Sequence, residues 1–122
     1  YNTVHGIWTY FTADDGQVDL KESDYLGIGT LESFTKMRNY YGEDAVCPVY
    51  IQVEDGERLA RALKREREQT NPKYEEMCRR FLADQSDFSE ENILAAGIRK
   101  RFQNVDLEVC VKEIVNYIKS VQ

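Results

Sequence analysis

The fold is decided by residues 46–68, VCPVYIQVEDGERLARALKRERE, where an apolar run passes directly into a charged, helix-forming segment. The run at residues 46–53 is typical of a strand that is covered on both faces. Asp55 is placed to cap a helix that continues to about Gln69. Because a buried strand followed at once by a helix is half of a β–α–β unit, we expect an α/β fold with a parallel sheet flanked by helices.

The same alternation continues on both sides of this stretch. Residues 1–12 are aromatic and β-leaning, which predicts a small β-rich N-terminal part. From residue 25 onward the expected order is strand, helix, strand, helix, helix, helix, strand and helix, over residues 25–30, 31–41, 46–53, 55–69, 74–88, 89–97, 98–103 and 107–121. The last helix carries the clearest apolar stripe, so we expect it to pack on the sheet.

Charge is distributed unevenly along the 122 residues. The net charge is −6, but residues 1–57 hold 3 basic and 11 acidic side chains, whereas residues 58–122 hold 13 and 11. An acidic chain argues against nucleic-acid binding. No apolar run approaches the ~20 residues needed to cross a bilayer, so no membrane partner is expected. Phosphate recognition, if present, belongs to the second half.

The cysteines and the histidine bear on the compartment and on metal binding. Cys47, Cys78 and Cys110 lie far apart and form no Cys-x-x-Cys pair. We therefore expect buried, reduced thiols in a cytoplasmic protein. His5 is the only histidine, so no metal site is expected.

Arginine is concentrated on two expected helices. Eight of the 16 Lys and Arg residues lie between Arg58 and Arg80, on either side of the break at Asn71-Pro72. Guanidinium groups are planar forks that suit phosphate oxygens. Two such helices joined by a short polar loop could form a hinged lid over a polyphosphate. The alternative is that these arginines pair with neighbouring glutamates on solvated faces.

Two further features concern phosphate and nucleotide recognition. Tyr10 and Thr12 lie on the same side of the expected first strand, where their hydroxyls could bind a phosphate or a base edge. The alternative for them is a half-buried aromatic strand. The chain contains no Gly-x-x-x-x-Gly-Lys-Ser/Thr loop. Glu32 stands where a dinucleotide-binding loop that begins at Gly27 would need its third glycine.

Taken together, these segments resemble the guanylate kinase family. The similarity is strongest over residues 59–88, where a Leu-x-x-x-Leu segment with basic residues leads, after a polar interruption, to Arg79-Arg80-Phe81-Leu82-Ala83. Asn104-Val105-Asp106-Leu107 is similar to the family's Asn-Asp-Leu motif after the last strand. His5-Gly6 with Tyr10-Phe11-Thr12 resembles its His-Gly-Asn and Tyr-Gly-Thr segments.

The resemblance implies a partial P-loop-kinase-like fold and a nucleoside monophosphate kinase that converts ATP and GMP to ADP and GDP. Residues 1–30 would be part of the nucleotide-monophosphate-binding region. Residues 31–122 would be the rear part of the kinase core, with a helical lid at residues 64–80. ATP and Mg²⁺ would be the cofactors of the intact protein, and we expect this chain alone to bind neither tightly.

The resemblance also implies roles for individual residues. Arg65, Arg67, Arg79 and Arg80 would clasp the phosphates as catalytic residues of the lid. Tyr10 and Thr12 would contact GMP, Glu32 would replace one of the family's acidic residues, and Asn104 would lie near the adenine of ATP. No metal ligand is implied.

The sequence departs from the family pattern at three places. The phosphate loop is missing, the Asp-x-Asp-x-Gln-Gly pattern falls on residues 27–32, and Phe11 replaces a glycine. We therefore expect a fragment that resembles the rear two-thirds of such an enzyme and is inactive alone. A catalytically dead guanylate kinase-like module that binds a phosphorylated partner, and a scaffold whose charges are only solvated pairs, remain alternatives. An incomplete sheet would also favour a homo-oligomer that covers the exposed core surface.

Overall fold

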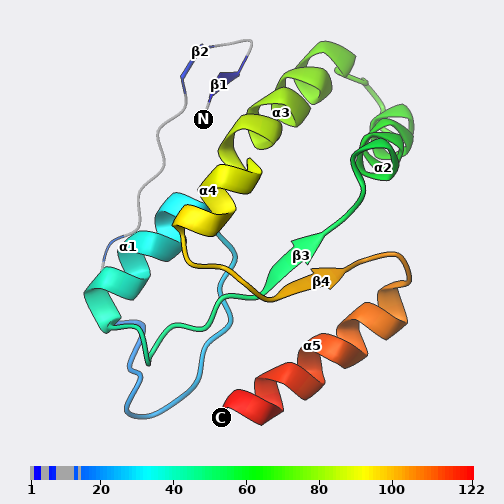
Figure 1. Cartoon of the computed structure of the whole chain (residues 1–122). Coiled ribbons are helices and arrows are strands. Elements are labelled where there is room, and N and C mark those ends of the chain that lie inside the picture. Colours follow the sequence, from blue (N-terminus) through cyan, green and yellow to red (C-terminus); the bar gives the residue numbers. More distant parts are fainter. Residues whose placement is uncertain (1, 4–5, 8–12, 14) are drawn as a thin grey trace.

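The computed structural model describes residues 2–3, 6–7, 13 and 15–122 and is a mixed α/β fold, mostly helical, with one small parallel sheet (Figure 1). Its elements, in chain order, are β1 (Asn2–Thr3), β2 (Gly6–Ile7), α1 (Leu31–Tyr41), β3 (Tyr50–Gln52), α2 (Asp55–Arg67), α3 (Tyr74–Asp87), α4 (Glu90–Ala95), β4 (Arg101–Gln103) and α5 (Leu107–Val121). Among the described residues, no helix is both long and apolar enough to cross a membrane.

The central sheet consists of β3 and β4, which run parallel as predicted. Ile51 pairs with Phe102, flanked by the pairs Tyr50–Arg101 and Gln52–Gln103. Parallel neighbours need a crossover connection, and α2, α3 and α4 supply it. β1 and β2 form a separate antiparallel pair that contacts α3.

The two faces of this sheet carry separate cores. On one face Phe102 is almost completely buried, and its ring lies 5.3 Å from that of Tyr117 on α5. On the other face Tyr50 lies 6.1 Å from Phe88 and packs against a buried cluster of Ile93, Ala96 and Ile98. Leu31 and Phe34 of α1 complete that cluster. The sheet is therefore the middle layer, with α5 on one side and α1 with α4 on the other.

Local capping signals explain where most helices begin and end. Gly42, with a φ of 97°, ends α1, and the Ser89 hydroxyl accepts a hydrogen bond from the Asn92 N–H at the start of α4. The predicted cap of α2 was wrong by one residue. The carboxylate of Glu54, not of Asp55, accepts hydrogen bonds from the N–H groups of Gly56 and Glu57, at 2.8 and 2.9 Å. Glu54 occupies the N-cap position, from which its side chain reaches forward to the free N–H groups of the first turn.

Three other predictions need correction. Residues 25–30 form no strand, and Leu26 and Ile28 are fully exposed, because no described segment lies beside them to pair with their backbone. The strands predicted at residues 46–53 and 98–103 shrink to three residues each. Cys47 and Cys78 are exposed, and only Cys110 is buried, because α5 is the one cysteine-bearing element that presents its thiol to the sheet.

Candidate functional site

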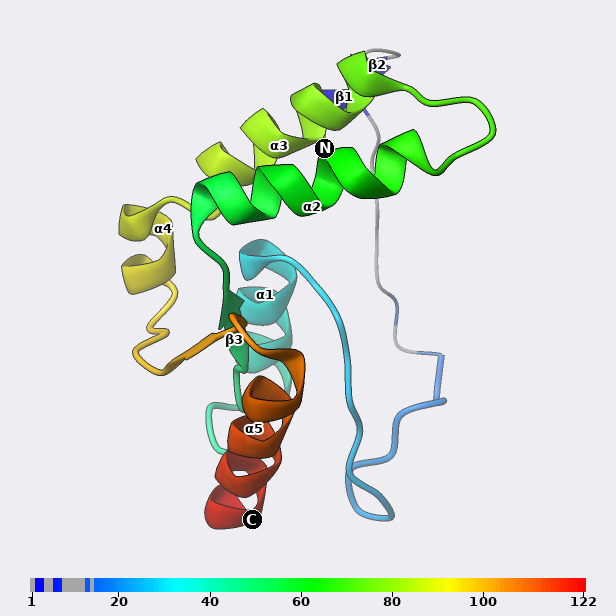
Figure 2. The same cartoon turned by 90° about the vertical axis from the view of Figure 1, so that its right-hand side faces the viewer.

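The predicted lid, residues 64–80, spans the end of α2, the turn and the first half of α3, and these two helices lie side by side as an antiparallel hairpin (Figures 1 and 2). At its base Arg58 on α2 donates a hydrogen bond to Gln85 on α3, and the Gln85 amide donates to Asp55 at 3.1 Å. At its turn the Lys73 N–H donates to the Glu66 carboxylate at 2.8 Å. The hairpin is therefore held at both ends by side-chain contacts.

Asn104, the predicted adenine neighbour, directly follows β4 in the chain and lies beside α2, the first helix of the hairpin. Its N–H donates to the carbonyl of Gln52 at 2.9 Å, which continues the β3–β4 ladder by one bond. Its carbonyl accepts a hydrogen bond at 3.1 Å from Arg61, whose Nε also lies 2.9 Å from the Glu57 carboxylate. Ligands of open α/β sheets bind outside the carboxyl ends of the strands, and Asn104 is fixed there.

The four predicted lid arginines fall into two groups. Within the described part of the chain, the guanidinium groups of Arg65, Arg67 and Arg79 have no hydrogen-bond or ion-pair partner, and all three are exposed. Arg80 differs, because its Nε lies 3.5 Å from the carboxylate of the buried Glu76 one turn earlier. Three of the four are therefore available to an external anion, and the fourth is engaged.

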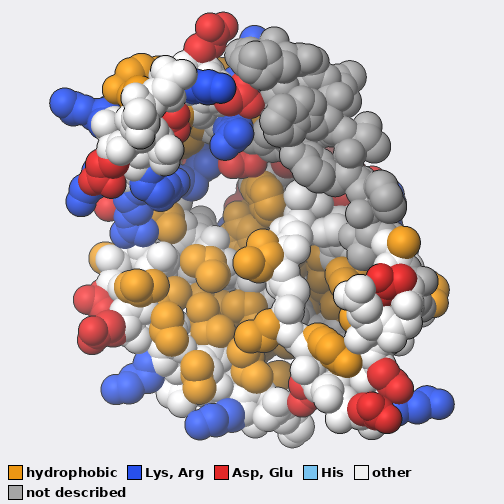
Figure 3. Space-filling view, turned by 180° about the vertical axis from the view of Figure 1, so that it is seen from behind, with side chains coloured by type: hydrophobic (Ala, Val, Ile, Leu, Met, Phe, Trp, Pro, Cys, Tyr) orange, Lys and Arg blue, Asp and Glu red, His pale blue; other side chains and the backbone are white. Residues whose placement is uncertain are grey.

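The hairpin register places Arg65, Arg67 and Arg79 on adjoining turns of the two helices, with Arg65 and Arg67, two residues apart, on opposite sides of α2. Arg58 meets Gln85 at the base of two antiparallel helices, so the last turns of α2 lie beside the first turns of α3. Arg65 and Arg67 occupy the former, and Arg79 occupies the latter. Lys and Arg side chains gather at this end of the molecule in the space-filling view (Figure 3). Within the described residues none of the three guanidinium groups forms an ion pair, although Glu66, Glu68 and Glu75 lie on the same turns.

Arginines closer to the sheet have structural partners. The Arg58 guanidinium lies 4.2 Å from the Phe81 ring centroid and 3.6 Å from Asp55. Arg101 binds both carboxylate oxygens of Glu90, at 2.5 and 2.7 Å, and this hydrogen bonding lowers the pKa of Glu90. The glutamate-pairing alternative therefore describes the base of the hairpin and the sheet but not the three arginines near the turn.

The remaining predicted substrate residues are not brought to this site. Tyr10 and Thr12 lie outside the described residues. Glu32 is on α1, at the other end of the molecule from the hairpin turn (Figure 1). Its carboxylate pairs with Lys36 at 2.7 Å, and the hydrogen bond from Lys36 lowers the pKa of Glu32. Within the described residues no cluster of His, Cys, Asp and Glu could hold a metal ion.

Sequence analysis missed two residues of the site. Arg61 links α2 to Asn104 through a hydrogen bond between residues 43 positions apart in the sequence. Asp84 on α3 is partly buried near Arg58, and its pKa is raised by burial, against the charge of Arg58. Neither contact has a local sequence signal, since each joins residues far apart in the chain.

No family model, curated protein or solved structure matches the chain. A guanylate kinase-like function is therefore a hypothesis that depends on the motifs and on the geometry of the hairpin.

Proposed function

We propose that the chain is a guanylate kinase-like phosphotransferase module whose α2–α3 hairpin holds the phosphate groups of a nucleotide. The observation that carries this proposal is the set of three exposed arginines, Arg65, Arg67 and Arg79, which have no partner within the described residues. They lie near the turn of a hairpin that is anchored at the carboxyl ends of two parallel strands. A charged tip on an anchored base is what a phosphate-binding lid requires.

The chemistry of phosphoryl transfer fits such a site. The bond between the γ-phosphorus of ATP and its β–γ bridging oxygen breaks, a bond to a phosphate oxygen of GMP forms, and ADP and GDP result. Mg²⁺ would have to enter with ATP and would supply charge neutralisation, since no cluster of described His, Cys, Asp or Glu residues could hold it. Arg65, Arg67 and Arg79 would bind non-bridging oxygens and neutralise their charge, and Asn104 would orient the base at the strand ends.

A second function is favoured by a specific observation. Glu32 is paired with Lys36 and lies away from the hairpin, and the sequence has no phosphate loop of the Gly-x-x-x-x-Gly-Lys-Ser/Thr type. Arginine forks bind a phosphorylated side chain as well as a nucleotide. The alternative is therefore a catalytically dead interaction module that uses the same three arginines to hold a phosphopeptide.

Calorimetry with ATP, GMP and a phosphoserine peptide separates the two functions. We expect ATP binding to weaken about tenfold in Arg65→Ala and in Arg79→Ala, because each removes a charge-assisted contact. Arg99→Ala is the matched control, since Arg99 is also exposed and without a partner in the described residues but lies outside the hairpin. It should change the affinity less than twofold.

Three results would count against the proposal. Peptide binding without nucleotide binding would favour the interaction module. Equal losses in Arg79→Ala and Arg99→Ala would mean that only net charge matters. No binding of any ligand at millimolar concentration would remove both functions and leave a scaffold. A coupled ATP/GMP assay should show no turnover by this chain alone, because its sequence has no phosphate loop.

A further inference from the structure

The chain exposes far more surface than its mass predicts for a folded monomer. Its accessible surface is 9968 Å² at a mass of 14.2 kDa. A monomeric protein of that mass exposes about 6,800 Å². The difference of about 3,200 Å² exceeds the ~800 Å² that each partner buries in a standard stable interface. This excess includes residues 15–30, every one of which is exposed, so it does not by itself place a partner on α5.

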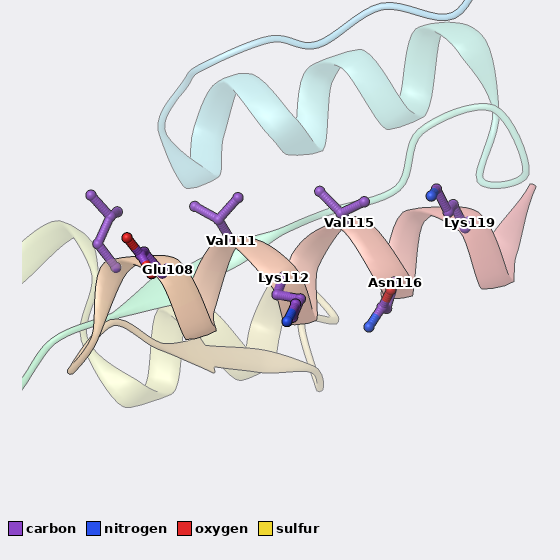
Figure 4. A pocket seen from close by; sticks show the side chains of 7 residues that line it. Glu108, Val111, Lys112, Val115, Asn116 and Lys119 are labelled. Carbon is purple, nitrogen blue, oxygen red and sulfur yellow. The ribbon is translucent and has the colours of Figure 1, made fainter.

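Helix α5 presents one apolar side to the sheet and another to solvent. Cys110 is buried, and Tyr117 contacts Phe102. Leu107, Val111 and Val115, spaced four residues apart, are 67%, 50% and 42% exposed. They line a shallow hollow on one side of α5, where Val111 and Val115 point toward the side on which α1 lies and Lys112 and Asn116 point away from it (Figure 4). The sheet therefore covers only part of the apolar surface of α5, and the rest of that surface faces solvent.

The sheet beneath α5 is also incompletely covered. Ile51 and Phe102 are paired in register, so their side chains point to the same face. Phe102 is 2% exposed, whereas Ile51 is 52% exposed, so α5 covers the β4 half of this face and leaves the β3 half open. Among the described residues, neither outer edge of the two strands has a strand partner. Hydrophobic side chains gather over this half of the molecule (Figure 3).

The charges beside the hollow are arranged in a self-complementary way. Glu108 lies near the start of α5 and Lys119 near its end, and both line the hollow beside the three apolar side chains. Lys112, near the middle of α5, lines the hollow as well and adds a positive charge there. The separation of eleven residues between Glu108 and Lys119 corresponds to about three turns, or ~16 Å, which returns to the same side of a helix. Two copies of α5 packed antiparallel would bring each Glu108 to Lys119 of the other copy. Parallel packing would instead oppose like charges.

We propose that this surface is an interface with a second copy of the chain, formed by two α5 helices that pack antiparallel. A two-fold axis near residue 113 places Val111 against Val115 of the second copy. The same axis creates two Glu108–Lys119 pairs at the rim and buries Leu107 under the stem of Lys119. A second copy is the occupant because one surface supplies both halves of the charge pattern. The proposal does not depend on nucleotide binding by the hairpin.

Sedimentation velocity across a range of protein concentrations tests the interface. We expect the wild-type chain to form a dimer and Val111→Asp to be monomeric, with the dissociation constant raised at least about tenfold by an unpaired buried charge. Val109→Asp is the matched control. Val109 is 57% exposed on the same helix but does not line the hollow, so this variant should dimerise normally.

Charge reversal tests the register without touching apolar packing. Glu108→Lys should weaken the dimer about tenfold at low salt, because two attractive pairs become repulsive. The double variant Glu108→Lys with Lys119→Glu should restore the wild-type dissociation constant. A wild-type chain that stays monomeric would overturn the proposal. So would equal effects of Val109→Asp and Val111→Asp, or a double variant that is no stronger than Glu108→Lys alone.

Discussion

Arg58 fastens the base of the hairpin through three contacts made by one guanidinium group. It lies over the Phe81 ring at 4.2 Å, pairs with Asp55 at 3.6 Å and donates a hydrogen bond to Gln85. Its side chain is 29% exposed, so the contacts are only partly screened by water. Truncating this side chain should therefore separate α2 from α3 at the point where both approach the sheet.

The size of the effect follows from these contacts. A partly shielded cation–π contact contributes about 1 kcal/mol. A side-chain hydrogen bond contributes about 1 kcal/mol, and an ion pair at this exposure adds less than about 0.5 kcal/mol. Because one group makes all three, they are not fully additive. We expect Arg58→Ala to lower the free energy of unfolding by about 2 kcal/mol. Arg58→Lys keeps the charge but loses the planar fork, so it should lose about half as much.

Urea unfolding followed by circular dichroism measures this change. Arg65→Ala is the control, since Arg65 lies two turns further along α2 and has no partner within the described residues. Its stability should stay within about 0.5 kcal/mol of the wild type. If Arg58→Ala and Arg65→Ala lose the same amount, the contacts of Arg58 do not hold the hairpin and the reasoning is refuted.

Two further predictions concern the core and the pH dependence of stability. Phe102→Ala should lower the free energy of unfolding by about 3–5 kcal/mol, because Phe102 is the largest fully buried side chain of the described residues. Val105→Ala, at an exposed site, is the control and should lower it by less than about 0.5 kcal/mol in the same urea titration. Asp84→Asn should stabilise the protein at pH 7, because burial raises the pKa of Asp84 above its ordinary 3.8 and so disfavours its charged form in the folded state. The wild type should therefore gain stability relative to the variant as the pH falls through the raised pKa of Asp84. Below about pH 3.8 the two proteins should be equally stable. A stability difference that grows toward acid pH would contradict a raised pKa for Asp84.

Helix positions could be predicted from the sequence because their signals are local. Gly42 and Ser89 mark helix ends through their own backbone and side-chain geometry, and α1 and α5 occupy the predicted residues. Strand positions were predicted less well. A strand exists only beside a partner, so the aromatic and glycine-containing residues 25–30 carry a strand pattern without forming one.

In the candidate site, too, contacts between residues far apart in the chain could not be predicted from the sequence. Arg58 and Arg65 are seven residues apart on one helix and share a face, so helical spacing alone does not distinguish them, although a phosphate-binding role was predicted for Arg65 only. The structure separates them, because Phe81 and Gln85 reach Arg58 from α3 and no described group reaches Arg65. Sequence spacing predicts which side chains share a face, but only the packing of α3 decides which of them is already occupied.

The arginines near the sheet are bound to protein groups, whereas three of those near the turn have no partner in the described part of the chain, and this difference determines where the hairpin could bind an anion. Arg58 and Arg61, nearest the sheet, are bound to protein groups, and Arg61 also ties α2 to Asn104. At the other end one contact, from the Lys73 N–H to the Glu66 carboxylate, holds the turn, and Arg65, Arg67 and Arg79 have no partner within the described residues. An anion bound at that end would supply the interactions that the protein itself withholds there. The same argument explains why net charge alone is a poor guide to phosphate binding. The chain is acidic as a whole, yet among its described residues Arg65, Arg67 and Arg79 of the hairpin have no ion-pair partner.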